Sequence, residues 1–171
     1  ADGPSSSTVR ASLKKANKAL AREIEHIGKA MDALVRKDDT LEKDLKRAKT
    51  VKGIGTKTAM TILAEFGDLR QYNRDELVAL CGLYPREYTS GTSVRKKPRL
   101  VKGGKAHVRA ALYMCAMSAI RADAHLGAFA QRLAQNGKEP MQVIGAVMRK
   151  LLMLVRAVVV SETDYDPHYQ Q

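Results

Sequence analysis

Apolar side chains recur at helical spacing along the first third of the chain. A leucine or isoleucine appears every seven residues, and other apolar residues fill an alternate position between them, with charged residues in the outward positions. The first series is Leu13, Leu20, Ile27, Leu34 and Leu41, and the second holds Ile24, Met31 and Leu45. This heptad pattern predicts a coiled coil or a helical hairpin. We therefore expect a helical arm over residues 8–50, with a break at Asp38-Asp39-Thr40 and a second helix from Thr40 to Thr50 capped by Asp39.

The pattern after residue 50 predicts several packed helices. Asn73 is a typical N-cap, and the segment 106–122 is apolar on nearly every face, so it should lie at the centre of the core. Further helices are expected over 124–136 and from Pro140 to about Val160. No run of residues alternates as a sheet would require. The predicted fold class is all-α: a coiled-coil arm, then a compact helical domain over 51–160 that contains a helix-hairpin-helix motif and a basic loop.

Both ends of the chain are polar and are expected to lie outside these units. Residues 1–7, which begin Ala1-Asp2-Gly3-Pro4, suggest a linker or an engineered remnant, and residues 161–171 suggest a loosely held tail. The most apolar segment, Leu151 to Val160, is short and is interrupted by Arg156, so no membrane span is predicted. Cys81 and Cys115 sit in apolar helical contexts and predict free thiols in a reducing compartment such as a cytoplasm.

A glycine-rich turn opens the second unit. The segment Val51-Lys52-Gly53-Ile54-Gly55-Thr56-Lys57 precedes an apolar helical run, which is the pattern of a helix-hairpin-helix motif. Two glycines permit a tight turn, and the first amides of the next helix can point at a phosphate. We predict contacts to a nucleic-acid backbone from Lys52, Gly53, Gly55 and Lys57. An ordinary turn between two packed helices is the alternative.

Positive charge concentrates in the segment 82–109. The chain has a net charge of +12, and residues 86–109 hold eight Lys or Arg against one acid, Glu87. These residues are the expected phosphate contacts: Arg86, Arg95, Lys96, Lys97, Arg99, Lys102, Lys105 and Arg109. A pI near 9.9 points to a polyanionic partner, with nucleic acid ahead of a membrane surface because the cations follow a Gly/Pro loop.

Ser90, followed by Gly91, is the candidate nucleophile in this basic segment. Phosphoryl transfer needs a nucleophile, in-line geometry and cations around the equatorial oxygens. The residues alone leave the role of Ser90 open, because Thr89, Thr92 and Ser93 are equally eligible and no base or carboxylate cluster accompanies them. A turn, or a hydroxyl that only contacts phosphate, is the alternative. The scattered histidines predict no metal site.

Several short motifs, in this order and spacing, resemble the C-terminal transposase domain of a bacterial insertion-sequence family. That family includes Piv-type DNA invertases and bridge-RNA-guided recombinases. The motifs are Gly53-Ile54-Gly55, then Leu63-Ala64-Glu65-Phe66-Gly67-Asp68, then Gly82-Leu83, Pro85-Arg86 and Ser90-Gly91, and finally Lys102, Gly104, Arg109 and Leu112-Tyr113. The resemblance covers about Thr50 to Val160, and the heptad arm matches the coiled coil of the family.

The resemblance implies that Ser90 is a nucleophile that joins covalently to DNA during strand exchange. It also implies that the missing half of the active site is a RuvC-like domain with four acidic residues that bind Mg²⁺. We expect no cofactor in this chain itself, DNA as partner, a structured guide RNA as a possible second partner, and homo-oligomers formed through the arm. Two other hypotheses stay open: a non-catalytic helix-hairpin-helix module that holds a nucleic-acid backbone, and an assembly scaffold with incidental charge.

Overall fold

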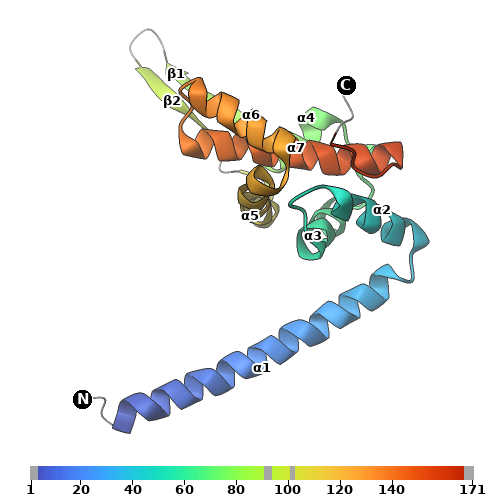
Figure 1. The fold of residues 1–171 in the computed structure, drawn as a ribbon, viewed down its shortest axis with the longest axis vertical. Coiled ribbons are helices and arrows are strands. Elements are labelled where there is room, and N and C mark those ends of the chain that lie inside the picture. The colour runs from blue at the N-terminus through green and yellow to red at the C-terminus, as the bar shows by residue number, and fades with distance from the viewer. Residues whose placement is uncertain (1–3, 91–93, 101–102, 168–171) are drawn as a thin grey trace. The chain divides into compact units, whose positions relative to one another are not determined.

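The computed structural model describes residues 4–90, 94–100 and 103–167, with the backbone alone described between 86 and 100. The chain divides into two units, Ala1–Glu42 and Lys43–Gln171, and each is considered by itself. Figure 1 shows the order of the elements along the chain. The described residues form seven α-helices, a short 3-10 helix and one pair of strands.

A single long helix, α1 (Pro4–Val35), makes up most of the first unit. It begins within the segment expected to be a linker, where a proline suits the first turn because that turn needs no backbone N–H. The predicted heptad residues from Leu13 to Leu34 form its apolar stripe and are 39% (Met31) to 63% (Leu34) exposed, whereas Leu41 and Leu45 of the same series lie on the next helix, where Leu45 is buried. The residues of the α1 stripe stay exposed because one helix has nothing of its own unit to pack against. The helix is thus present, while its pairing as a coiled coil stays a prediction.

Helix α2 (Asp39–Thr50) follows after the predicted break. Its cap is Asp38, one residue before the predicted cap. The Asp38 Oδ1 accepts hydrogen bonds from the backbone N–H groups of Thr40 and Leu41, both at 3.0 Å. The carboxylate of Asp38 is therefore the group that satisfies the free amides of the first turn.

The second unit is built around helix α5 (Ala106–Ala122), which packs against α3 (Thr56–Phe66), α6 (Ala124–Gln135) and α7 (Pro140–Ser161). Leu112 of α5 and Leu151 and Leu152 of α7 are fully buried in this core. Figure 1 shows α6 and α7 running beside each other, with α5 close to them. The prediction that 106–122 is the central helix is confirmed, and so are the helices expected at 124–136 and from Pro140.

Two short elements link α3 to the basic segment: the 3-10 helix η1 (Leu69–Gln71) and helix α4 (Arg74–Leu80). Asn73 caps α4 as predicted. Its side chain accepts from the backbone N–H of Glu76, and the Glu76 carboxylate accepts from the N–H of Asn73. This reciprocal capping box fixes the start of α4 and hence the point from which the basic segment leaves.

The basic segment is not a loop, as predicted, but contains an antiparallel pair of strands, β1 (Pro85–Ser90) and β2 (Val94–Leu100). The helical fold class is confirmed for the rest of the described chain, and this hairpin departs from it. The strands are not predicted from the sequence because their positions are occupied mainly by Lys, Arg, Ser and Thr. Such residues show no alternation of apolar and polar positions that would indicate a buried face. The register shifts between Arg86 and Tyr88, opposite the stretch that holds Pro98. A proline has no N–H for the ladder and fits at such an irregularity.

The C-terminal segment is tied to the body as far as Tyr165, which differs from the loose tail expected. The Tyr165 hydroxyl donates to Asp123 Oδ2 at 2.8 Å, and its backbone N–H donates to Thr50 Oγ1 at 2.8 Å. Asp123, which is buried, also caps α6 by accepting from the N–H of Leu126 at 2.9 Å. One carboxylate therefore holds both a helix start and the tail.

A charge network connects α2 with the same tail. The buried carboxylate of Asp44 accepts from Arg70 at 2.7 and 3.0 Å and from Arg47 at 3.3 Å. Glu162, just after α7, pairs with Arg47 at 3.5 Å and with Arg70 at 3.2 Å. Arg47 and Arg70 therefore have a structural role, because their guanidinium groups donate the hydrogen bonds that a carboxylate removed from water requires.

Candidate nucleic-acid interface

The hairpin places Ser90 at the end of β1, where its register partner is Val94. The residues between these two lie outside the described chain. Along the ladder, Thr89 pairs with Arg95, Tyr88 with Lys96, and Arg86 with Arg99. Arg86 and Arg99 carry the same charge on opposite strands, which is unfavourable unless an anion lies beside them. The register thus places five of the predicted phosphate contacts on one hairpin, whose first strand ends at Ser90.

The base of the hairpin is closed by Arg109, on the first turn of α5. Its Nη1 donates to the carbonyl oxygens of Cys81 and Gly103, both at 2.9 Å. These carbonyls lie before β1 and after β2, so one guanidinium bridges the two ends of the hairpin. The sequence predicts that Arg109 contacts phosphate, and the structure shows that it also closes the base of the hairpin.

A backbone contact closes the same base from the other side. The N–H of Lys105 donates to the carbonyl of Leu80 at 2.8 Å. Gly104 adopts a φ of +77°, and a Cβ built there would collide with the Leu80 carbonyl oxygen, only 2.2 Å away. A glycine is therefore required at this position for both conformation and space.

Glu65 of α3 holds two cationic residues at the start of α5. Its carboxylate oxygens lie 2.5 Å from Lys105 Nζ and 2.7 Å from His107 Nε2. The hydrogen bond from Lys105 lowers the pKa of the Glu65 carboxyl, with His107 adding to the effect. The same contact raises the pKa of Lys105. Lys105, a predicted phosphate contact, is thus already paired, and it can meet a phosphate only by sharing or leaving Glu65.

His107 was not identified as a site residue from the sequence. Nothing in its local sequence signals a role, because its partner Glu65 lies on another helix and comes close only in the folded chain. Together Glu65, Lys105, His107 and Arg109 fix the hairpin to α3 and α5.

The glycine-rich turn at residues 51–55 contains two glycines, of which one packs closely on α5 and the other faces open space. Gly53 has a φ of +90°, and a Cβ there would lie 2.6 Å from the Cβ of Ala119 and 2.9 Å from the carbonyl of Cys115. Its smallness lets the turn sit directly on α5. Gly55 is exposed, and a Cβ there would meet nothing within 4 Å.

Gly55 is also the N-cap of α3 and provides no side-chain cap. The first amides of α3 therefore have no side-chain capping partner, and the exposed side chains of Lys52 and Lys57 flank them. The contact with a nucleic-acid backbone that the sequence predicts here stays a prediction, and it would form at this helix start.

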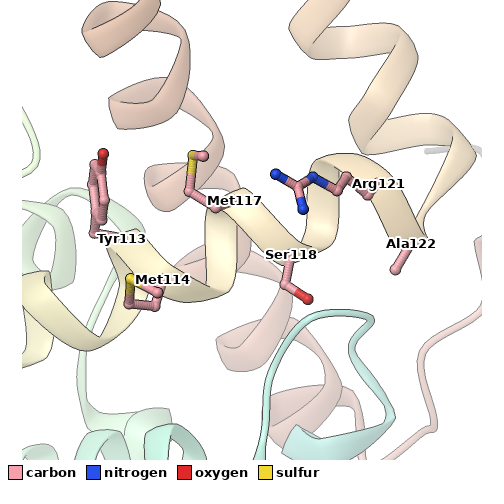
Figure 2. Close-up of a pocket in the computed structure, with 6 residues that line it drawn as sticks. All are labelled: Tyr113, Met114, Met117, Ser118, Arg121 and Ala122. Carbon is pink, nitrogen blue, oxygen red and sulfur yellow. The ribbon is translucent and has the colours of Figure 1, made fainter.

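An open groove of about 510 Å³ runs along the exposed face of α5. Its lining residues are Tyr113, Met114, Met117, Ser118, Arg121 and Ala122. Figure 2 shows Tyr113, Met117 and Arg121 along one edge of the helix and Met114 and Ser118 along the other. Ser118 precedes Ala119, the residue that receives Gly53, so the groove adjoins the glycine-rich turn.

Part of the predicted site is not open to description. Lys102 lies outside the described residues, and the side chains of Arg86, Ser90, Arg95, Lys96, Lys97 and Arg99 do too. Among the residues that are described, no cluster of His, Cys, Asp and Glu could hold a metal ion. Within the same part of the chain, no helix is long and apolar enough to cross a membrane.

Residues 45–131 match the family model described as "Transposase IS116/IS110/IS902 family". The chain belongs to this transposase family. The matched region runs from the middle of α2 through the glycine-rich turn, the hairpin and α5 into α6. The resemblance seen in the sequence motifs is confirmed at the level of the family.

Three proteins are similar to parts of this chain. The pilin gene-inverting proteins of Moraxella bovis and Moraxella lacunata are each 36% identical over 120 residues, which is 68% of this chain. The transposase for insertion sequence element IS1111A of Coxiella burnetii is 39% identical over 49 residues, which is 28% of this chain and 14% of that relative. The chain spans 37% of the length of the two Moraxella relatives.

Proposed function

We propose that this chain is the DNA-binding, serine-bearing domain of a transposase or recombinase that exchanges DNA strands of a mobile element, by transposition or inversion. The observation that carries the proposal is the basic hairpin, whose base is held by hydrogen bonds to the helical body. Ser90 ends a strand whose base is held by Arg109, Gly104 and Lys105, in a family of transposases. A fixed base limits the positions that the serine can sample, which favours in-line attack.

In the proposed step, the Ser90 hydroxyl oxygen attacks a phosphorus atom of the DNA backbone. A P–O bond to serine forms while the P–O bond to one deoxyribose oxygen breaks. The serine proton passes to a base, and the departing oxygen takes up a proton. Lys and Arg positions of the hairpin stabilise the charge on the equatorial oxygens.

The base and the metal would come from outside this chain. We infer that a RuvC-like domain supplies carboxylates that bind Mg²⁺ and face Ser90, in the same subunit or in another one. Such a composite site predicts that residues 1–171 alone bind DNA without cutting it efficiently. The arm α1, with its exposed heptad stripe, would join subunits, and a structured guide RNA is a second candidate ligand.

The alternative is a non-catalytic helix-hairpin-helix module with Ser90 only contacting phosphate. The open start of α3, flanked by Lys52 and Lys57, favours this second function. Both hypotheses require nucleic-acid binding, so binding alone does not separate them.

Covalent trapping separates the two hypotheses. A full-length recombinase that carries this domain is incubated with DNA of its element and Mg²⁺, denatured, and examined for a protein–DNA adduct. Ser90→Ala should abolish the adduct and retain DNA binding, whereas Thr89→Ala and Ser93→Ala should retain both. If the adduct persists in Ser90→Ala, Ser90 is not the nucleophile. Efficient strand transfer by residues 1–171 alone would contradict the composite site.

A further inference from the structure

Three helices of the second unit carry no acidic residue. Helices α5, α6 and α7 contain neither Asp nor Glu, and their six Lys or Arg residues are Arg109, Arg121, Arg132, Arg149, Lys150 and Arg156. Three of these have structural partners. Arg109 closes the hairpin, Arg149 pairs with Asp75 of α4 at 3.3 Å, and Arg156 donates to the carbonyl of Tyr72 at 2.7 Å. The others need a different explanation.

Two of the remaining cations meet on one aromatic ring. Lys150 Nζ of α7 lies 4.7 Å from the centroid of the Phe129 ring on α6, and Arg132 Cζ lies 5.6 Å from it. Both cationic side chains are exposed, and Phe129 is half-buried. In the part of the chain that the structure describes, neither cation has a carboxylate within ion-pair distance. Two helices thus present two charges that remain un-neutralised.

The ring restricts the two cations without neutralising them. A cation over the face of an aromatic ring is attracted by the ring quadrupole, and the aromatic contact leaves N–H groups available for other acceptors. Two ordered, un-neutralised cations suit a ligand with repeated negative charge. Exposed amides of the same helix hairpin, Gln131 and Gln135, add donors of the type that contact phosphate oxygens.

We propose that Arg132, Lys150 and Phe129 form a second contact for a nucleic-acid backbone, here called the α6–α7 patch. It uses other elements than the basic hairpin and the glycine-rich turn. Arg149, next to Lys150, pairs with Asp75 in the first turn of α4, whereas the hairpin leaves from the other end of α4. The patch is thus a contact built from other elements than the one proposed at Ser90. This inference rests on the proposed function in one respect, namely that the ligand of the patch is a nucleic acid.

The test measures binding of the whole chain to a random-sequence DNA duplex and, separately, to an RNA duplex between 50 and 200 mM salt. Arg132→Gln combined with Lys150→Gln should weaken binding roughly tenfold at the lower salt concentration. The salt slope should fall by about 1.8, because each lost duplex-phosphate contact removes about 0.9. Phe129→Leu keeps an apolar side chain but removes the ring, and it should give a smaller loss in the same direction.

The matched control is Lys14→Gln combined with Lys15→Gln, which removes the same charge from exposed positions of α1. It should change the affinity by less than twofold. A loss for DNA alone, RNA alone or both supports the patch and identifies its ligand. If the double variant in the patch behaves like the control while the unaltered chain binds nucleic acid, the patch is refuted and the proposed function stands. If the unaltered chain binds neither duplex, both proposals fail.

Discussion

Arg109 Nη1 and the carbonyl oxygen of Cys81 lie 2.9 Å apart, and the same nitrogen lies 2.9 Å from the carbonyl of Gly103. The two carbonyls flank the hairpin in sequence, so this guanidinium determines how the Ser90-bearing strands leave the helical body. Arg109 is a positioning residue for the proposed reaction, because it acts through the backbone of the hairpin and not through the substrate.

Replacing Arg109 tests this positioning. Arg109→Gln should lower the free energy of unfolding by about 2 kcal/mol, because two carbonyls lose a charged donor. Arg121→Gln is the matched control on the same helix, where the arginine is exposed, and it should change stability by less than about 0.5 kcal/mol. Chemical denaturation of both variants gives the comparison.

In the full-length recombinase, Arg109→Lys should restore part of the covalent adduct that Arg109→Gln loses. An equal loss in both would argue against positioning.

Gly53 and Gly55 should respond very differently to alanine. Gly53→Ala introduces a methyl group 2.6 Å from Ala119 Cβ at a φ of +90°, so we expect a loss of about 2–4 kcal/mol from overpacking and backbone strain. Gly55→Ala adds a methyl group in open space at a φ of −88° and should cost about 1 kcal/mol or less, because alanine is a poorer N-cap than glycine. Thermal melting of the two variants decides the matter. Equal melting temperatures would show that the turn does not pack on α5 as described.

Asp44 should matter for stability far more than Glu162, although both pair with Arg47 and Arg70. The side chain of Asp44 is 6% exposed and that of Glu162 is 61% exposed. Asp44→Asn leaves two partly buried guanidinium groups without their main partner and should cost about 2 kcal/mol. Glu162→Gln should cost about 0.5 kcal/mol or less. Urea denaturation measures both, and a larger effect at Glu162 would contradict the assigned roles.

Tyr165 makes stability depend on alkaline pH. Burial raises the pKa of its phenol, and the hydrogen bond to Asp123 adds to the shift. Because the folded pKa lies above the unfolded one, the stabilisation is full below about pH 10 and is lost as pH rises through the folded pKa. Tyr165→Phe should therefore lose about 1 kcal/mol at pH 7 and show a shallower decline between pH 9 and 11. Parallel declines in melting temperature for the two proteins would refute this linkage.

The helical elements were predictable because their signal is local. Helix α5 occupies the range predicted for the central helix, Ala106–Ala122, since apolar residues on nearly every face leave burial as the only favourable environment. Asn73 was identified as a cap because capping depends on residues three positions apart. Asp38 replaced Asp39 as the cap of α2, an error of one residue among adjacent acids that only the geometry of the turn could resolve.

The sequence does not predict the hairpin, for a physical reason. Strands are recognised from an alternation that buries one face, and β1 and β2 carry charge and hydroxyls in place of that alternation. Such strands hold together through backbone pairing and through the closure of their base by Arg109, Gly104 and Lys105. The contacts of Arg109 with Cys81 and of Lys105 with Leu80 join residues that are far apart in the sequence, so no local pattern predicts that the segment is held as a hairpin.

By itself, the sequence determined the helical class, the heptad stripe, the concentration of positive charge around Ser90 and the resemblance to a transposase domain. The first three features follow from composition and short-range spacing, and the last rests on the likeness of several short motifs to those of a known family. Only the tertiary structure decided that Gly53 serves the packing on Ala119, that Glu65 gathers Lys105 and His107, and that Arg109 closes the hairpin. Each of these arrangements brings together residues that are far apart in the sequence, and they meet only when the helices pack around α5.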